Sequence, residues 1–267
     1  MSVSTTDHGR VRLIKTHRAA ARGAVDPATA RALYDVFLAF DADDRVDVAV
    51  FSGSEGAFCA GFDLKTAADG SASDWIDFVD IPPDWEDARA TPLPGPMGPS
   101  RLLLRKPVIA AIEGHAVAGG MELAAWCDVR IMAETAVTGV FCRRWGVPLI
   151  DGGTVRLPAI MGQGRANDGI LSGRPIAAEE ARSLGFANQV VPEGQAEAAA
   201  LDYAAALTAF PQGCMLADHA AARLTGPELA RGLRREWRSA AMFAVEGQAG
   251  AARFAGGKGR GGDFTDI

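Results

Sequence analysis

The stretch that decides the fold is Glu113-Gly114-His115-Ala116-Val117-Ala118-Gly119-Gly120-Met121-Glu122-Leu123. It follows an apolar run of β type, Val108 to Ile112, and leads into a segment that can be helical. Small residues at such a turn let the backbone approach a ligand closely. The free N–H groups of the new helix then point at any negative charge that lies there. The stretch therefore predicts a strand, a ligand-facing turn and a helix.

A second patch of the same kind lies earlier in the chain and reads Ala57-Phe58-Cys59-Ala60-Gly61-Phe62-Asp63-Leu64. It also follows a β-type run, Val48 to Phe51. Two such turns can hold one oxygen atom between two N–H donors, which is an oxyanion hole. Glu122 lies within the first helical turn after Gly119, so a carboxylate accompanies the second patch. The pairing predicts chemistry beside a polarised carbonyl group.

Composition excludes several classes of protein. The chain has 267 residues, of which 48% are apolar and 22% charged, as in a folded globular protein. A net charge of -6, with Lys and Arg scattered along the chain, argues against nucleic-acid binding. No apolar stretch is long enough to cross a membrane, and the N-terminus has no signal-peptide pattern. The four cysteines have no C-x-x-C spacing, which favours free thiols and a cytoplasmic location.

The pattern along the chain predicts an α/β core and a helical region. Strand-like and helical segments alternate as far as about Val191, which indicates a parallel sheet with crossover connections. Beyond Glu193 the periodicity is helical only. We therefore predict a core over residues 1–195 and a C-terminal helical region over 196–267. Residues 82–99 are rich in proline and lack periodicity, which predicts a loop or lid.

Three single residues, Glu122, Asp151 and Cys142, are candidates for the chemistry of the site. Glu122 has apolar neighbours, so burial gives its carboxyl group a reason to hold a raised pKa and to exchange protons near neutrality. Asp151 precedes a glycine pair, and the simpler role for it is to cap the helix that follows. Cys142 has no neighbouring histidine that would activate it as a nucleophile. The histidines are dispersed, so we predict no metal site, and no G-x-G-x-x-G motif follows a strand to bind a dinucleotide.

In order and spacing, the motifs resemble those of the enoyl-CoA hydratase/isomerase (crotonase) superfamily. The resemblance extends from about Val11 to Val191. It includes residues 17–25, Phe58-Cys59-Ala60-Gly61-Phe62-Asp63-Leu64-Lys65, Gly119-Gly120-Met121-Glu122, Cys127-Asp128, Gly152-Gly153-Thr154-Val155-Arg156-Leu157-Pro158 and the segment from Gly173 to Gly185.

The resemblance implies a spiral of ββα units whose C-terminal helices serve assembly into trimers or dimers of trimers and close the site. It implies an acyl-CoA thioester substrate, with coenzyme A as part of that substrate and no further cofactor. The oxyanion donors would be the N–H groups of Phe62 and Gly119. The residues expected to contact the substrate or its CoA are Ala21, Arg22, Ala60, Asp63, Leu64, Lys65, Gly120 and Trp145.

The sequence departs from the family at one acid. Hydratases of the family generally carry two glutamates, and Glu122 matches the first. Cys142 stands where the second is expected, and a cysteine without an activating partner is a poor acid or base. Asp151 falls near a position that supplies an acid in dienoyl-CoA isomerases and in naphthoate-forming relatives. The resemblance thereby adds a role as catalytic partner to the simpler role of Asp151 as a helix cap.

Three hypotheses about function remain at this point. The first is an enoyl-CoA hydratase, which adds water to a 2-enoyl-CoA with Glu122 and Asp151 as its acids. The second keeps the thioester but changes the reaction to isomerisation or other enolate chemistry. The third, motivated by Cys142, is an acyl-CoA-binding protein with weak or no catalysis. The acyl chain and the pathway are not determined by the sequence.

Overall fold

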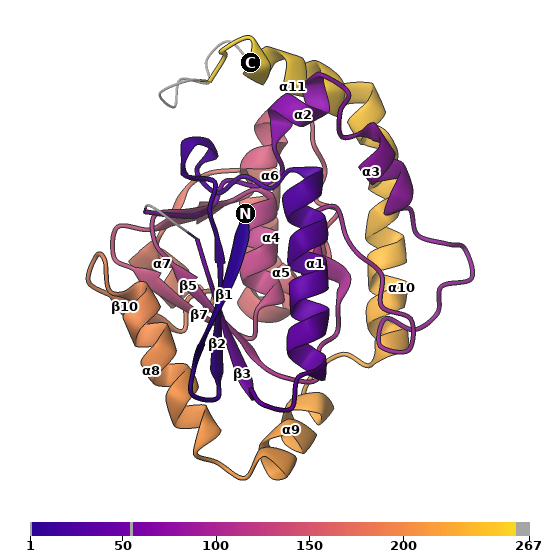
Figure 1. Ribbon diagram of the computed structural model, residues 1–267. Helices are drawn as coiled ribbons and strands as arrows, with labels where there is room; N and C mark the ends of the chain where they lie inside the picture. The colour runs from indigo at the N-terminus through magenta and orange to yellow at the C-terminus, as the bar shows by residue number, and fades with distance from the viewer. Residues whose placement is uncertain (1, 54–55, 260–267) are drawn as a thin grey trace.

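The computed structural model describes residues 2–53 and 56–259, and its chain forms two sheets with helices around them (Figure 1). The large sheet contains, in spatial order, β1 (Val3–His8), β2 (Val11–Thr16), β3 (Val48–Ser52), β5 (Val108–Ile112), β7 (Val129–Ala133) and β10 (Gln189–Val191). β1 and β2 form an antiparallel hairpin, and the remaining neighbours are parallel.

The small sheet contains β4 (Ala57–Cys59), β6 (His115–Val117), β8 (Val137–Gly139) and β9 (Ile176–Ala177). The chain passes repeatedly from a strand of the large sheet to a strand of the small one, as β3 to β4, β5 to β6 and β7 to β8. A helical segment follows each of these pairs. This arrangement confirms the predicted α/β class and the crotonase-like spiral of ββα units.

The α-helices are α1 (Pro27–Ala42), α2 (Leu64–Ala68), α3 (Ser73–Phe78), α4 (Gly119–Trp126), α5 (Gly153–Met161), α6 (Gln163–Ser172), α7 (Ala178–Ser183), α8 (Ala196–Thr208), α9 (Gln212–Ala221), α10 (Gly226–Trp237) and α11 (Gln248–Ala255). Shorter helical segments are η1 (Ala19–Ala21), η2 (Pro99–Arg101), η3 (Phe141–Trp145), η4 (Arg238–Ala240) and the π-helical η5 (Phe243–Gly247).

Strands β3 and β5 form the centre of the core. Every residue of both strands is buried, as expected for parallel strands that are covered on both faces. Helix α1 covers one face, and its Phe37 packs edge-to-face on Phe51 with ring centroids 5.4 Å apart. Asp26 caps α1 by accepting the Thr29 N–H at 2.8 Å. The buried apolar residues of α1, which are Ala30, Leu33, Phe37 and Phe40, recur at helical spacing because one side of the helix packs on the sheet.

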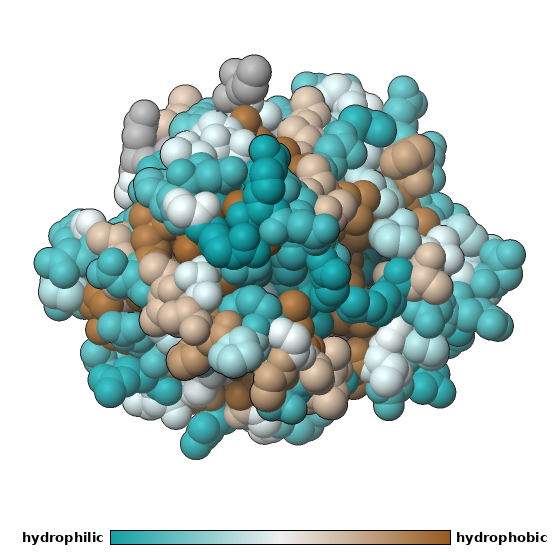
Figure 2. All heavy atoms as spheres, turned by 60° about the horizontal axis from the view of Figure 1, so that its bottom comes forward, coloured by the Kyte–Doolittle hydropathy of each residue, from teal (hydrophilic) through white to brown (hydrophobic). Residues whose placement is uncertain are grey.

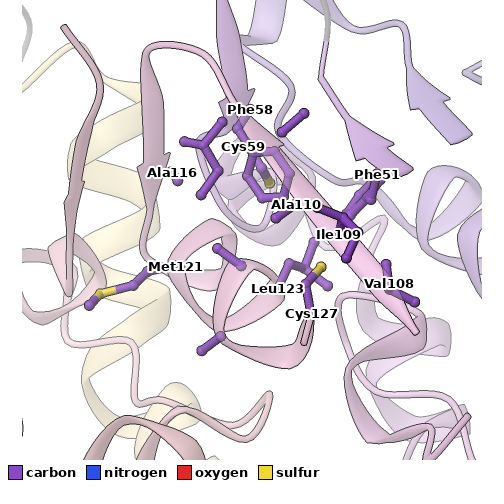
Figure 3. Packing of buried hydrophobic residues seen from close by; sticks show 14 of the residues in the cluster. Phe51, Phe58, Cys59, Val108, Ile109, Ala110, Ala116, Met121, Leu123 and Cys127 are labelled. Carbon is purple, nitrogen blue, oxygen red and sulfur yellow. The ribbon is translucent and has the colours of Figure 1, made fainter. Parts of the chain in front are cut away.

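Helix α4 is buried along nearly its whole length. Only Trp126, its last residue, is partly exposed. Figure 3 shows Leu123 and Cys127 directed toward β5, whereas Met121 leaves the helix on another side. A helix that is apolar on all sides belongs in the interior. This burial places the carboxyl group of Glu122 inside the protein.

The helices after residue 195 contact different parts of the core. α8 packs on the large sheet, on the side opposite α1 (Figure 1). α10 packs against α5, and α11 lies beside α2 and η3. The division at residue 195 stays a prediction, and these contacts bring the C-terminal helices directly onto the elements that surround the site described below.

The proline-rich segment has no helix or strand between α3 and η2, in agreement with the loop expected there. Trp75 of α3 anchors the segment to the rest of the protein, and Trp85 holds its conformation from within. The indole N–H of Trp75 donates to the carbonyl of Pro96 at 3.0 Å, and that of Trp85 donates to Thr91 at 2.7 Å. The loop is therefore held down on the molecule.

The surface mixes polar and apolar residues. On the end of the molecule that carries α9, apolar residues lie interspersed among hydrophilic ones (Figure 2). The large apolar side chains that remain exposed include Phe78, Leu171, Phe210 and Val245. Among the residues described, no helix combines the length and the apolar character needed to cross a membrane.

Candidate active site

The candidate site lies at the carboxyl edge of the small sheet. Its strands β4, β6 and β8 are parallel neighbours, so their C-terminal ends meet at one edge. Phe62 follows β4, Gly119 follows β6, and Cys142 follows β8. The topology thus brings together three positions that are far apart in the sequence.

The first turn presents the N–H group of Phe62. Gly61 adopts a φ of 95°, a conformation that favours glycine. On either side of Phe62 the backbone is held by Val25, which donates to the Gly61 carbonyl at 2.8 Å and accepts the Asp63 N–H at 2.9 Å. Within residues 2–53 and 56–259, the Phe62 N–H itself has no hydrogen-bond acceptor. The turn is rigid, and its donor is available to a ligand.

The second turn presents the N–H group of Gly119. Ala118, just before it, has a φ of 54° and a ψ of -128°, a conformation that costs a non-glycine residue about 1–3 kcal/mol. Gly119 is the first residue of α4, so its N–H has no partner inside the helix, and none is found elsewhere in the described part of the chain. A β-carbon on Gly61 would lie 3.1 Å from the Gly119 nitrogen. The two unpaired donors therefore belong to touching turns, as the predicted oxyanion hole requires.

Glu122 is fixed by one of its two carboxylate oxygens. Its Oε1 accepts the N–H groups of Asp151 and Gly153, both at 2.9 Å. No donor from the described residues reaches Oε2, which is left for a ligand or a water molecule. Burial raises the pKa of Glu122 well above its ordinary value, and the negative charges of Asp151 and Glu236 raise it further. Glu122 therefore binds and releases its proton at a higher pH than an ordinary carboxylic acid does.

Asp151 is anchored in the same way, and not as a cap of α5. Its Oδ1 accepts the N–H of Met97 at 2.9 Å and the hydroxyl of Ser100, and the N-cap of α5 is Gly152, which makes no side-chain cap. Asp151 is 3% exposed, and burial raises its pKa. Met97 also connects it to the donor turn, because a β-carbon on Gly119 would lie 2.8 Å from the Met97 sulfur. The simpler role of Asp151 as a helix cap was wrong.

Glu236 is a third buried acid, which our sequence analysis missed. It comes from α10, and it accepts the N–H groups of Gly152 at 2.6 Å and Thr154 at 2.8 Å. Burial raises its pKa as well. A signal was present, because Glu236 follows Leu229 and Leu233 at helical spacing and so falls on the apolar stripe of its helix. An acid on such a stripe points into the protein.

Two buried guanidinium groups lie near these acids. Arg156 donates to the carbonyls of Asp151 at 3.1 Å and Ser100 at 2.8 Å. Arg101 is fully buried over the Trp237 ring, 4.3 Å from its centroid, and burial lowers its pKa to about 10. Three carboxyl groups with two guanidinium groups leave an excess of negative charge, which favours keeping a proton on one of the acids.

Cys142 lies in η3 and is buried. Burial raises the pKa of its thiol to about 12, and the negative charge of Glu122 contributes to that rise. The thiol is therefore protonated at neutral pH and is a poor acid or base. Cys142 contributes a neutral group to the wall of the site beside Glu122.

The turn expected to meet CoA packs against the first donor turn. The carbonyl of Arg22 accepts the Ala60 N–H at 3.1 Å, so Ala21 and Arg22 lie close to Ala60. Asp63 caps α2 through the Lys65 N–H at 3.0 Å and binds Arg18 at 2.9 Å. Both of its carboxylate oxygens are thus used inside the protein.

The remaining expected contacts are placed as follows. Leu64 begins α2, and the next residue, Lys65, has an exposed side chain. Gly120 lies so close to the carbonyl of Cys59 that no side chain would fit there. Trp145 is buried beneath α11, where its ring packs edge-to-face on Phe254 at 5.3 Å. Contact of these residues with a substrate stays a prediction.

Within the described ranges, no three or more His, Cys, Asp or Glu side chains come together as a metal site. That the protein needs no cofactor besides the CoA of its substrate also stays a prediction.

Comparison with known proteins gives a consistent result. A family model described as enoyl-CoA hydratase/isomerase matches residues 6–94 and 100–255. The chain is 37% identical over 244 residues to a probable enoyl-CoA hydratase of Rhizobium meliloti, covering 90% of this chain and 89% of that protein. It is 35% identical over 199 residues to the carnitinyl-CoA dehydratase of Escherichia coli, covering 73% and 69%.

A similar solved structure is that of a carnitinyl-CoA dehydratase from Mycobacterium avium. It superposes with a TM-score of 0.77 at 26% sequence identity, and the match covers 93% of this chain and 94% of the other. The similarity therefore includes the C-terminal helices as well as the two sheets.

Proposed function

The chain belongs to the enoyl-CoA hydratase/isomerase family, and on that premise we propose that its acids Glu122 and Asp151 move the protons of an acyl-CoA hydration. The family and the named relatives identify it as an acyl-CoA hydro-lyase. The observation that carries the site assignment is the pairing of two unpaired N–H donors, at Phe62 and Gly119, with a buried glutamate one helical turn away.

The thioester carbonyl oxygen accepts hydrogen bonds from the N–H groups of Phe62 and Gly119. As water adds to the β-carbon of an enoyl-CoA, electron density moves to this oxygen and an enolate forms. The donors are fixed before the reaction, Gly119 by the start of α4 and Phe62 by the flanking bonds to Val25. Donors held in this way stabilise the enolate at little cost in reorganisation.

Glu122 acts on the water and the α-carbon. Its Oε1 is held by two N–H groups, so Oε2 is the oxygen that takes a proton from water and returns one to the α-carbon. The ionised form is the base. The pKa of Glu122 is raised. As the pH is lowered, the hydration rate should therefore begin to fall at a higher pH than it would with an ordinary carboxylate as the base.

Asp151 is the second acid. It is held at Oδ1, and no described residue donates to its other oxygen. Because the Cys142 thiol stays protonated, Asp151 takes the part of the missing glutamate, orienting the water or sharing the proton.

A substrate panel tests the function. The loss of enoyl-thioester absorbance is followed with crotonyl-CoA and with longer, branched and aromatic enoyl-CoAs, and the product is identified by mass spectrometry. A 3-hydroxyacyl-CoA product, formed by wild type and not by a Glu122→Gln control, supports the proposal. A product of unchanged mass with a moved double bond would support isomerisation instead, for which Cys142 in place of an acid is the motivating observation. Tight binding of every thioester without any product would support the third hypothesis.

Assembly and location belong to the proposal as well. The exposed apolar side chains, among them Leu171 and Val245 at 76% and 68%, are the kind that subunit contacts cover. We expect a homotrimer or a dimer of trimers, which light scattering coupled to gel filtration would measure. The four cysteines are free, which favours a reducing compartment and supports the cytoplasm as the location.

A further inference from the structure

We propose that Glu236, on helix α10 of the C-terminal region, is a positioning residue for the two acids of the site, Glu122 and Asp151. This inference rests on the proposed function, because both acids must take part in the reaction for their positions to matter. It is carried by the contacts at the start of α5.

The N–H groups from residue 151 to residue 154 alternate between two carboxylates. Glu122 accepts the first and the third, each at 2.9 Å. Glu236 accepts the second and the fourth, at 2.6 and 2.8 Å. Residues 151–154, which lead into α5 and are called the α5 turn below, are therefore held between an acid of α4 and an acid of α10.

Glu236 makes these contacts with both of its oxygens. Oε1 accepts the N–H and the hydroxyl of Thr154, each at 2.8 Å, and Oε2 accepts the N–H of Gly152. Hydrogen bonds to an ionised carboxylate are roughly twice as strong as those between neutral groups, and a helix N-terminus favours negative charge. With both oxygens occupied, Glu236 acts on the reaction through the turn and not by contact with the substrate.

The position of the turn decides the position of both acids. Asp151 is part of it, and Glu122 is oriented by two of its N–H groups. Misplacing a reacting group by about 1 Å can cost on the order of 100-fold in rate. Loss of Glu236 would free two N–H groups, and the turn would no longer be held on the side of α10.

Glu236 also contributes charge. The groups that surround Glu122 are Asp151 and Arg156 from the α5 segment, Cys142 from η3 and Glu236 from α10. The Cys142 thiol is neutral. Besides burial, it is the negative charges of Asp151 and Glu236 that raise the pKa of Glu122. A neutral side chain at position 236 should lower that pKa, and the acid limb of the rate profile should then move to lower pH.

The packing of α10 delivers Glu236 to this place. Leu229 and Leu233 anchor the helix in a small apolar cluster with Trp85. Gly232 lies close to Val155 of α5, since a β-carbon at position 232 would be 3.2 Å from the Val155 side chain. Helix α10, which the sequence pattern assigns to the C-terminal helical region, therefore supplies a functional group to the site.

Glu236→Gln in the full chain tests the proposal. The expected result is a fall in kcat of about 10- to 100-fold, a KM for enoyl-CoA within a few-fold of wild type, and an acid limb displaced to lower pH. Glu236→Asp keeps the charge but is one methylene shorter. It should lose kcat while moving the acid limb less. Circular dichroism and Tm establish that each variant is folded.

Glu228→Gln is the matched control. Glu228 lies on the same helix, about 12 Å from Glu236 by helical rise, and forms an exposed capping box with Thr225. Its loss should lower Tm through the helix end and leave kcat and the pH profile unchanged. A wild-type kcat and an unmoved acid limb in folded Glu236→Gln would overturn the proposal, as would a wild-type kcat in folded Glu236→Asp.

A second readout does not need turnover. In protein labelled with 13C at the glutamate carboxyl carbons, the Glu122 signal is identified by its absence from Glu122→Gln and is titrated with pH. It should titrate at lower pH in Glu236→Gln than in wild type. If wild type hydrates no enoyl-CoA, the proposed function fails while this titration still measures the coupling. An unchanged titration would refute the coupling even in an active enzyme.

Discussion

A glycine pair lies at the start of both α4 and α5. Gly119-Gly120 are the first two residues of α4, and Gly152-Gly153 are the N-cap and the first residue of α5, but the N–H groups at the two helix starts have different partners. The Gly119 N–H has no acceptor within the described ranges. The N–H groups at the start of α5 are taken by Glu122 and Glu236.

The difference shows that a helix N-terminus can serve two purposes. A helix N-terminus is an anion site whatever its sequence. At α4 the site is left to the substrate oxygen, whereas at α5 the protein supplies the anions itself, and their positions become those of the reacting acids. Which purpose a glycine pair serves depends on acids that other helices bring to it.

Glu122→Gln should have the largest effect on activity. The variant keeps an oxygen for the N–H groups of α5 but removes the titrating proton, so we expect turnover to fall by about 100- to 10,000-fold with acyl-CoA affinity within a few-fold. Steady-state kinetics and calorimetric binding measure the two quantities. Wild-type turnover would mean that the α5 turn holds an acid with no part in the reaction.

Gly119→Pro should remove the unpaired N–H donor at the start of α4. Proline removes the N–H but suits the first position of a helix, so we expect about 100- to 1000-fold lower kcat and weaker thioester binding. Gly119→Ala is the control, because it adds a β-carbon against Met97 and keeps the N–H. Equal loss in both variants would show that crowding causes the effect and would contradict the assignment of the Gly119 N–H as an oxyanion donor.

Asp151→Asn should lower the rate by about 100-fold or more, the usual scale for a lost acid–base group. Asparagine can still accept the N–H of Met97 and the hydroxyl of Ser100, so Met97 and Ser100 should stay in place. A melting curve like that of wild type, together with the lower rate, is the expected pair of results. Full activity would leave Asp151 with a structural role at the start of α5.

Cys142→Ser should have the smallest effect, a change of rate within a few-fold. The thiol is protonated at neutral pH because burial raises its pKa, and serine replaces it with another neutral group of similar size. A large loss of rate in a folded variant would show that the strand end after β8 contributes chemistry. Gain of hydratase activity by Cys142→Glu, with Asp151→Asn fully active, would describe the chain better as an impaired relative with one glutamate.

Local pattern alone determined the alternation of strands and helices, the two donor turns and Glu122, whereas the ββα spiral was implied by the family resemblance. Small residues between a buried strand and a helix leave few conformations, and Gly61 and Gly119 therefore mark their turns in the sequence. The family resemblance added the thioester and drew attention to Asp151 and Cys142.

Only the tertiary structure decided which carboxylates meet. Glu122 and Glu236 are far apart in the chain, and nothing in either segment says that both accept N–H groups of one turn. Asp151 has the sequence of a helix cap, yet its side chain turns to Met97 and Ser100. The spacing of residues along one helix fixes which side chains share its face, whereas contacts between helices depend on how the whole chain packs. For that reason the sequence located the unpaired N–H group at the start of α4, whereas only the fold revealed that Glu122 and Glu236 accept the N–H groups at the start of α5.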